Sequence, residues 1–463
     1  MERKDVRMEE FRNIIIGFGK AGKTLAAFLA KKGEKTVLVE KDNQMYGGTC
    51  INVACIPSKA LETAARLSKS IGGDFEKQSL FYINAIQEKK NLTSQLRKKN
   101  YEMVVNSGAS VIDGEASFID KNTIQIKKTD GTVENVRGER IFINTGSRPF
   151  LPPIPGLKES HFVYTSESLM NLSILPKRLL VLGGGYIGLE FASYYNNFGS
   201  EVTVLQDGET FIPKEDREIA DEVEASFKER GITLLKGVKT KEVKDLDGFL
   251  QVTIEKDGKE ETLEAEALLV ATGRRPNIEG LHLENAKVEV SDHNNIVTDI
   301  HKKTNVDNIF AMGDVTGGFQ FTYISLDDFR IVKDYLYGKG ERTTENRGAI
   351  PYTVFVDPTL SRVGLSEEEA IKKGYDIGVC RLKVNTIPKA KVLKSQVGLL
   401  KAIIDKKTDL ILGVHLFAVE SQEMINLAKL AIDQNIPYTV LRDDIYNHPT
   451  MTEAYNDLFK NVQ

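Results

Sequence analysis

Two closely spaced cysteines, Cys50 and Cys55, are the side chains of this sequence best suited to redox chemistry. The 463-residue chain has only one other cysteine, Cys380, so it lacks the disulfide framework that is typical of secreted proteins. In a reducing compartment, such a pair is more often catalytic, redox-sensing or metal-binding than structural. A zinc site needs four Cys or His ligands, and no second cluster completes one, so we expect no metal site. We therefore interpret the pair as a redox-active dithiol and Cys380 as an incidental, partly buried thiol.

The residues around the pair favour a reactive thiol. Gly47 and Gly48 precede a helical stretch, which would put Cys50 near a helix N-terminus, where the pKa of a thiol is lowered. A disulfide between the two cysteines would span about 1.4 helical turns. The helix must therefore be distorted, and Pro57 follows closely. We expect a strained, exposed disulfide, which is easily reduced.

A dinucleotide-binding fingerprint precedes the cysteines. A continuous apolar run over 13–16 predicts a buried strand. A glycine-rich turn, a helix over 23–32 and a second strand over 36–39 follow. The glycines allow a pyrophosphate to approach the helix N-terminus, and an acid after the second strand takes a ribose hydroxyl. The residues of this fingerprint are Gly17, Gly19, Gly22 and Glu40.

The same pattern recurs later in the chain. A strand over 178–182 leads into a second glycine-rich turn, and a helix and a strand over 201–205 follow. Gln206 takes the position that Glu40 has in the first copy. The glycines of the second copy are Gly183, Gly185 and Gly188. Two fingerprints so far apart predict two separate domains, each with its own dinucleotide.

Three short turns could complete the cofactor sites. Each follows an apolar run and consists of small residues, so the chain can pass close to a ligand there. These turns contain Thr145 and Gly146, Gly273, and Gly313 and Asp314. Asp314 is well placed to hydrogen-bond a polyol. The proline-rich stretch 149–155 supports a crossover between domains.

The segment from Gly47 to Lys59, GGTCINVACIPSK, closely resembles the redox motif of the pyridine nucleotide–disulfide oxidoreductases. This family includes lipoamide dehydrogenase, glutathione reductase and mercuric reductase, and the resemblance covers nearly the whole chain. It implies an α/β fold with two Rossmann-like dinucleotide-binding domains and a C-terminal α+β dimerisation domain. The implied domains are 1–148 with 276–344 for FAD, 149–275 for NAD(P)H, and 345–463 for dimerisation.

The resemblance also implies which residues bind the cofactors. FAD would be held by Gly17, Gly19, Gly22, Glu40, Lys41, Gly48, Thr49, Lys59, Thr145, Gly146, Gly313 and Asp314. NADH or NADPH would be held by Gly183, Gly185, Tyr186, Ile187, Gly188, Gln206 and Gly273. Gln206 carries no charge to repel a 2′-phosphate, yet no arginine stands beside it, and the nearest downstream cations are Lys214 and Arg217. Because Gly188 is similar to the residue in NADH-using relatives, we favour NADH.

The two cysteines take different roles by the same resemblance. Cys55 would face the flavin, and Cys50 would meet the substrate. Lys59 would lie beside the flavin and pair with Glu190, which follows the second glycine motif.

A histidine near the C-terminus resembles the last part of the family's active site. His448 and Glu453 have the spacing of its His–Glu dyad, which a homodimer supplies across its twofold interface to the partner's dithiol. An imidazole that a carboxylate orients can protonate a thiolate leaving group near neutral pH.

A narrower resemblance concerns the substrate. Segments 45–50 and 313–330 look like those of the bacterial reactive-chlorine-resistance reductases, which include hypothiocyanous acid (HOSCN) reductases and some copper(II) reductases. The implied substrate is a small oxidant, most of all HOSCN, in oxidative-stress defence. The alternatives are a dihydrolipoamide dehydrogenase, a glutathione-type disulfide reductase, a Cu(II) or other metal reductase and, outside the enzymes, a redox-sensing flavoprotein. No cysteine follows Cys380, which argues against mercuric reductase and the large thioredoxin reductases.

Charge and hydropathy exclude other classes of protein. The net charge is −4, without a long basic block, so we expect no nucleic-acid partner. No apolar run approaches the ~20 residues that span a bilayer. The polar segment 1–13 lacks the apolar stretch of a secretory signal. We therefore expect a cytoplasmic protein without a membrane partner.

Overall fold

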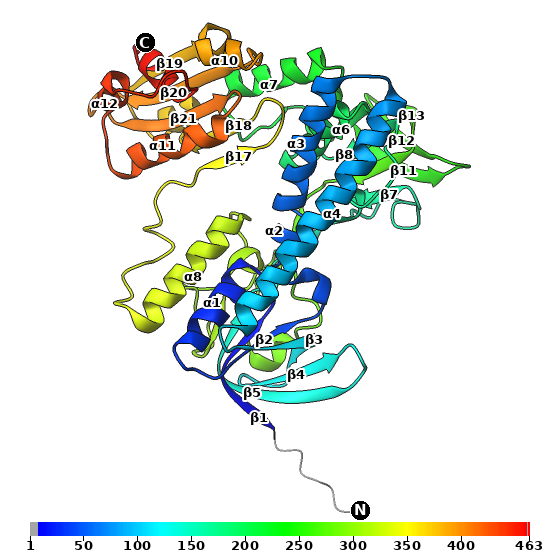
Figure 1. The fold of residues 1–463 in the computed structure, drawn as a ribbon, viewed down its shortest axis with the longest axis vertical. Coiled ribbons are helices and arrows are strands. Elements are labelled where there is room, and N and C mark those ends of the chain that lie inside the picture. The colour runs from blue at the N-terminus through cyan, green and yellow to red at the C-terminus, as the bar shows by residue number, and fades with distance from the viewer. Residues whose placement is uncertain (1–7, 461) are drawn as a thin grey trace, which may run out of the picture. The chain divides into compact units, whose positions relative to one another are not determined.

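The computed structural model describes residues 8–460 and 462–463 (Figure 1). Residues 1–7, which belong to the polar N-terminal segment, and Asn461 lie outside the described residues. The chain forms two compact units. Unit 1 comprises Met1–Ala60, Ala85–Phe150 and Arg274–Arg347, and unit 2 comprises Leu61–Asn84, Leu151–Gly273 and Gly348–Gln463. The boundaries of the three expected domains stay a prediction.

Unit 1 is built on a six-stranded sheet around the first glycine motif. Strand β1 (Glu9–Ile16) pairs in parallel with β2 (Thr36–Glu40) on one side and with β5 (Val133–Ile143) on the other. The other strands of this unit are β3 (Ser110–Phe118), β4 (Thr123–Lys128) and β16 (Ile309–Ala311), and the separate pair β6 (Ser147–Pro149) and β15 (Arg274–Pro276). Only β4 runs antiparallel to its neighbours in the six-stranded sheet.

Both faces of β1 are buried over residues 13–16, as the apolar run predicts. Ile14 packs into one core with residues of β4, and Ile15 packs into another with helices α1 and α8. The helices assigned wholly or partly to unit 1 are α1 (Lys20–Lys31), α2 (Thr49–Asn52), α3 (Cys55–Ile71), α4 (Phe75–Val105) and α8 (Thr322–Tyr337). Helix α1 begins three residues before the predicted start because Gly19 is its N-cap.

Unit 2 contains a second parallel sheet around the second glycine motif. Its five strands follow the order β10-β9-β8-β14-β7, and every neighbouring pair is parallel. They are β7 (Val163–Thr165), β8 (Arg178–Leu182), β9 (Glu201–Gln206), β10 (Thr233–Lys236) and β14 (Ala267–Val270). The accompanying helices are α5 (Ser166–Leu169), α6 (Tyr186–Asn197) and α7 (Arg217–Glu229), and an antiparallel sheet consists of β11 (Lys239–Asp245), β12 (Leu250–Lys256) and β13 (Lys259–Ala265).

The C-terminal part of unit 2 is an antiparallel sheet with helices (Figure 1). Its strands are β17 (Tyr352–Val354), β18 (Leu360–Gly364), β19 (Ile377–Lys383), β20 (Leu399–Asp405) and β21 (Ile411–Phe417). Its helices are α9 (Glu367–Lys372), α10 (Pro388–Val392), α11 (Ser421–Asp433), α12 (Tyr438–Asp443) and α13 (Ala454–Leu458). The predicted α+β character of this part is observed.

A buried ion cluster joins this sheet to α7 within unit 2. Lys401 on β20 is 1% exposed, and its Nζ lies 2.8 Å from Asp216 Oδ1 and 2.5 Å from Glu218 Oε2. Glu367 supplies a third carboxylate at 2.7 Å. Burial acts to lower the pKa of Lys401, but the carboxylates outweigh it and the pKa is raised. The lysine therefore stays charged and fixes α7 against the sheet.

None of the helices within the described residues is long and apolar enough to cross a membrane.

Candidate active site

A break in the helix at Val53 brings the two cysteines together. Helix α2 ends at Asn52, and Val53 has φ −141° and ψ 13°, outside helical geometry. Cys50 is therefore the second residue of α2, and Cys55 is the first residue of α3. Pro57 lies in the first turn of α3, where a missing N–H costs no helical hydrogen bond. The distortion that the spacing predicts takes the form of this interruption.

The structure holds the pair as two thiols in contact. Both cysteines are free, and they share a side-chain hydrogen bond. Thr322, the first residue of α8, has its Oγ1 3.5 Å from Cys55 Sγ. The Cys55 thiol and burial raise the pKa of Cys50, whereas Thr322 and Lys23 act in the opposite direction.

The predicted lowering of the Cys50 pKa by a helix N-terminus is therefore wrong for the dithiol. Helix α2 has only four residues, so its dipole is small, and the neighbouring sulfur outweighs it. Cys50 is half-buried and Cys55 is exposed in the single chain. Cys380 lies in the C-terminal core, where burial raises the pKa of its thiol to about 11 and keeps it protonated.

The first glycine motif permits close packing that no side chain would allow. Gly17 has φ +99°, and a Cβ there would lie 2.5 Å from the carbonyl oxygen of Asn144. A Cβ on Gly22 would lie 2.5 Å from the carbonyl oxygen of Gly17. Gly19 caps α1 without a side-chain hydrogen bond, which leaves the helix N-terminus suited to a phosphate.

The acid of the motif has the expected position at the end of β2. The Phe18 N–H donates to Glu40 Oε2 at 2.8 Å, and the Asp42 N–H donates to Oε1 at 3.2 Å. Burial raises the pKa of Glu40 to about 7, although these donors act to lower it. Lys41, the next residue, is exposed.

Asn144 connects the separate parts of this site and was missed by the sequence argument. Its Oδ1 accepts from the Gly22 N–H at 2.8 Å, and its Nδ2 donates to the Met312 carbonyl at 2.6 Å. The residue is 4% exposed. Its own segment contains the predicted Thr145 and Gly146, and Thr145 Oγ1 donates to the Asn277 carbonyl at 2.6 Å. An asparagine at the end of a buried strand was the only signal that could have identified it.

The Gly313–Asp314 turn begins a 3₁₀ helix after β16. The Ser147 hydroxyl donates to Asp314 Oδ2 at 2.8 Å, and the Gly313 N–H donates to Asp328 Oδ2 at 2.7 Å. Burial raises the pKa of Asp314. Gly313 has φ +73°, and a Cβ there would lie 2.8 Å from the Ser325 hydroxyl.

The dithiol segment lies against the glycine motif. A Cβ on Gly48 would be 2.8 Å from the Cα of Gly19, and Thr49 is the first residue of α2. The glycine motif, Glu40, the Asn144–Thr145 segment and the Asp314 turn thus form one site in unit 1. A helix N-terminus capped by glycine, a buried acid and tightly packed glycines are what FAD requires, so these residues fit it.

The second glycine motif repeats this packing in unit 2. Gly183 has φ +115°, and a Cβ there would lie 2.5 Å from the Ala271 carbonyl. Gly185 caps α6 without a side-chain hydrogen bond. Gln206 Nε2 donates to the carbonyls of Gly208 and Thr210 at 2.6 and 2.9 Å. The remaining predicted residues here are Tyr186, Ile187 and Gly188 in the first turn of α6, and Gly273 after β14 with φ +113°.

Glu215 is a second residue that the sequence argument missed. Its Oε1 accepts hydrogen bonds from the hydroxyls of Tyr186 and, at 2.7 Å, Tyr352. It is 4% exposed, and its Oε2 has no hydrogen-bond partner among the described residues. Burial and Glu215 raise the pKa of Tyr186. Glu215 therefore fixes the tyrosine of the nucleotide motif.

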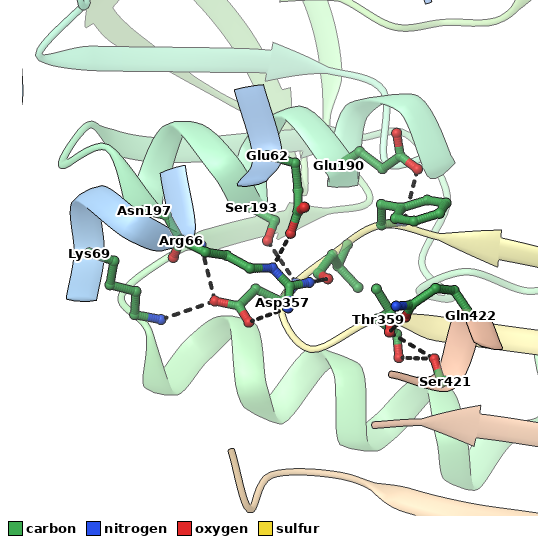
Figure 2. Close-up of polar contacts among 12 residues, drawn as sticks. Glu62, Arg66, Lys69, Glu190, Ser193, Asn197, Asp357, Thr359, Ser421 and Gln422 are labelled. Carbon is green, nitrogen blue, oxygen red and sulfur yellow. Dashed lines mark hydrogen bonds and ion pairs between the residues drawn. The ribbon is translucent and has the colours of Figure 1, made fainter. Parts of the chain in front are cut away.

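Lys59 and Glu190 belong to different units. Lys59 Nζ donates to the Ser58 hydroxyl at 3.3 Å. Figure 2 shows the Glu190 carboxylate, which accepts from the Phe355 N–H at 2.8 Å. The predicted ion pair between Lys59 and Glu190 stays a prediction.

The His–Glu dyad is present in unit 2. His448 Nδ1 lies 2.7 Å from Glu453 Oε2, and the Thr450 N–H donates to Glu453 Oε1 at 3.2 Å. The His448 side chain is 70% exposed, whereas that of Glu453 is 20% exposed. A half-buried carboxylate thus orients an imidazole that remains open to solvent in the single chain.

The fold and these sites define the class of protein. A family model described as pyridine nucleotide-disulphide oxidoreductase matches residues 11–328, and the dimerisation domain of the same family matches residues 350–459. The chain belongs to the pyridine nucleotide–disulphide oxidoreductase family. The predicted fold class is confirmed, and the chain is an enzyme of this FAD- and pyridine-nucleotide-dependent family.

Individual proteins of the family are similar to this chain over nearly its whole length. A probable pyridine nucleotide-disulfide oxidoreductase, RclA of Escherichia coli, is 46% identical over 98% of this chain and 100% of its own length. A mercuric reductase of Lysinibacillus sphaericus is 33% identical over 97% of this chain and 82% of its own. A solved Cu(II) complex of the HOCl-induced flavoprotein disulfide reductase RclA from Escherichia coli superposes with a TM-score of 0.92 at 45% identity. That match covers 98% of this chain and 99% of the other, and the predicted resemblance to the reactive-chlorine-resistance reductases is confirmed.

Replacement of Asn144 by alanine should release bound FAD. The change leaves the buried Gly22 N–H and Met312 carbonyl without partners, which costs about 2–4 kcal/mol. We expect a lower melting temperature and a lower ratio of flavin to protein absorbance after gel filtration. Asn305→Ala is the control, because Asn305 is an exposed asparagine of the same unit. Wild-type flavin content and stability in Asn144→Ala would contradict this role.

Proposed function

We propose that this protein reduces hypothiocyanous acid with electrons from NADH at the Cys50–Cys55 pair, as a cytoplasmic defence against oxidants. The observation that carries the proposal is the contact between the half-buried Cys50 thiol and the exposed Cys55 thiol, next to a site that fits FAD. Within the described residues, the third cysteine is buried in a different core, so the pair must meet the substrate itself. The HOCl-induced relative supports an oxidant as the substrate.

We propose the cofactor sites that the sequence predicts. We assign FAD to residues 1–148 and 276–344, the nicotinamide nucleotide to 149–275, and dimerisation to 345–463. When bound, FAD would take a hydride from the nicotinamide and supply two electrons to the disulfide. Glu40 would bind a ribose hydroxyl, and Asp314 would hydrogen-bond the polyol chain of the flavin.

Cys50 would carry out the attack on the substrate. Its thiolate displaces hydroxide from the sulfur of HOSCN, and a proton converts the hydroxide to water. The product is a sulfenyl thiocyanate, Cys50–S–SCN. The Cys55 thiol then loses its proton and attacks Cys50 Sγ, so that the disulfide forms and thiocyanate leaves. The sum is dithiol plus HOSCN giving disulfide, water, thiocyanate and a proton.

His448 of the partner subunit would supply the proton for the departing hydroxide. The bond to Glu453 fixes the orientation and tautomer of the ring. The exposed imidazole suits a group that acts on another chain. The match to a dimerisation domain over residues 350–459 supports a homodimer.

The nucleotide site supports NADH over NADPH. The side-chain amide of Gln206 donates its hydrogen bonds to carbonyls of its own loop. The guanidinium of Arg217 donates to the carbonyls of Phe211 and Ile212, both at 3.0 Å. A cation committed to backbone carbonyls is poorly placed to bind a 2′-phosphate.

A substrate panel tests the proposal directly. HOSCN, lipoamide, glutathione disulfide, Hg(II) and Cu(II) would each be offered with NADH and with NADPH. We expect the highest kcat/KM for HOSCN with NADH, by at least about tenfold over each other pair, a difference of roughly 1.4 kcal/mol in transition-state stabilisation. A higher kcat/KM for lipoamide or glutathione disulfide would assign the chain to those reductases, and preferred reduction of Cu(II) or Hg(II) would make it a metal reductase.

The Cys50→Ser variant is the control for this panel. It should bind FAD and accept electrons from NADH, yet lose HOSCN turnover, because serine is not a nucleophile at this position. Full HOSCN reductase activity in the variant would rule out the mechanism. No oxidation of NADH by the wild type with any substrate would favour a redox-sensing flavoprotein.

Mixed dimers test whether His448 acts across the interface. Cys50→Ser and His448→Ala chains, each inactive or about 100-fold impaired alone, would be co-expressed with different tags and purified as heterodimers. If the histidine acts on the partner's dithiol, the heterodimer has one complete site and about half of the wild-type activity.

A second heterodimer is the matched control. It pairs the wild-type chain with a chain that carries both substitutions. Action across the interface predicts that this heterodimer is impaired, because the intact dithiol faces the altered histidine. The opposite pattern, with activity only in the second heterodimer, would show that each chain uses its own histidine.

A further inference from the structure

Lys23 is a buried lysine that the glycine motif does not require. It lies on α1 directly after Gly22 and is 3% exposed. Its Nζ donates to the Gly47 carbonyl at 3.2 Å and to Asn100 Oδ1 at 2.5 Å. Gly47 is three residues before Cys50 in the dithiol segment. The ammonium is thus fixed to the segment that carries the reactive thiol.

The hydrogen-bond partners of Lys23 are neutral. Among the described residues, no carboxylate forms an ion pair with it. A buried cation without a counter-ion is unfavourable. Burial and the nearby Lys20 accordingly lower the pKa of Lys23 to about 8, and Cys50 is the group that acts to raise it. Within the protein, the Cys50 thiolate is an anion that would compensate this charge.

The interaction is reciprocal. Lys23 acts to lower the pKa of Cys50, against the effects of Cys55 and burial. Thr322, which begins α8, acts in the same direction as Lys23 but carries no charge. Lys23 is therefore a cation that favours the anionic form of Cys50.

We propose that Lys23 is a positioning residue whose buried ammonium stabilises the Cys50 thiolate in the reduced enzyme. The proposal rests on the proposed function, because it concerns the thiol that attacks the substrate. The hydrogen bond from Lys23 to the Gly47 carbonyl fixes the ammonium beside the dithiol segment. Helix α1 would then both bind the cofactor and stabilise the thiolate of Cys50. The lysine takes no part in bond formation.

The pH dependence of the effect of Lys23 on Cys50 follows from the lowered pKa of Lys23. Lys23 is charged at neutral pH and loses its proton as the pH rises through about 8. Its support for the thiolate is therefore present below about pH 8 and fades above it. Among the described residues, Lys20 on α1 and Cys55 on α3 are titratable groups that act on the pair.

Alkylation of Cys50 tests this proposal without the proposed substrate. The FAD-bound protein would be reduced anaerobically, desalted and treated with iodoacetamide between pH 5 and 10, with the Cys50 peptide quantified by mass spectrometry. In Lys23→Met, the apparent pKa of Cys50 should rise by about one unit, so that alkylation at pH 7 slows about tenfold. Lys23→Arg should keep most of the wild-type profile because it keeps the charge.

Two further variants distinguish the loss of the Lys23 charge from a general effect of removing a buried lysine. Lys89→Met removes another buried lysine of unit 1 whose pKa is also lowered to about 8 by burial, and it should leave the Cys50 profile unchanged. Asn100→Asp keeps Lys23 but adds a carboxylate beside it, and it should raise the Cys50 pKa as Lys23→Met does. This variant also serves if Lys23→Met fails to retain FAD.

Unchanged Cys50 profiles in Lys23→Met and Asn100→Asp would overturn the proposal and leave Lys23 as a structural anchor of the Gly47 segment. A wild-type enzyme that does not turn over HOSCN but shows the expected alkylation shifts would overturn the substrate assignment alone.

Discussion

The chemistry of this protein depends on one interruption of a helix. A continuous helix from Thr49 to Ile71 would hold the side chains of Cys50 and Cys55 on different faces, more than a turn apart. Because Val53 leaves helical geometry, each cysteine occupies the first turn of its own helix, and their sulfurs share a hydrogen bond. The same two residues can then exist as a dithiol or as a disulfide without a large movement of the backbone.

The interruption is held in place by the first glycine motif and helix α1. Gly48 packs so closely against the backbone of Gly19 that it has no room for a side chain, and Lys23 on the following helix donates to the Gly47 carbonyl. On the other side of the motif, Asn144 connects the helix to the strand that precedes Asp314. The groups that fit the cofactor and the groups that react are therefore parts of one packed structure.

Local patterns in the sequence are sufficient to predict the fold class and part of the candidate site. The two glycine fingerprints predict the parallel strand pairs β1–β2 and β8–β9. The spacing of His448 and Glu453 predicts their hydrogen bond because both lie in one short loop. Asn144 was not predictable, since its partners are 122 and 168 residues away. Glu215 was missed for the same reason, because Tyr352 is 137 residues further along the chain. The pKa of Cys50 was assigned the wrong direction because sequence spacing predicts a helix terminus but does not give the effect of a neighbouring sulfur and of burial.

The central claim is that electrons from a nicotinamide nucleotide reach the Cys50–Cys55 disulfide. A count of thiols on the oxidised, FAD-bound protein before and after one equivalent of NADH without oxygen tests it most directly. After the addition, differential alkylation and mass spectrometry should show two new thiols per chain, at Cys50 and Cys55, with Cys380 unchanged. Consumption of NADH without new thiols at these two positions would contradict the account.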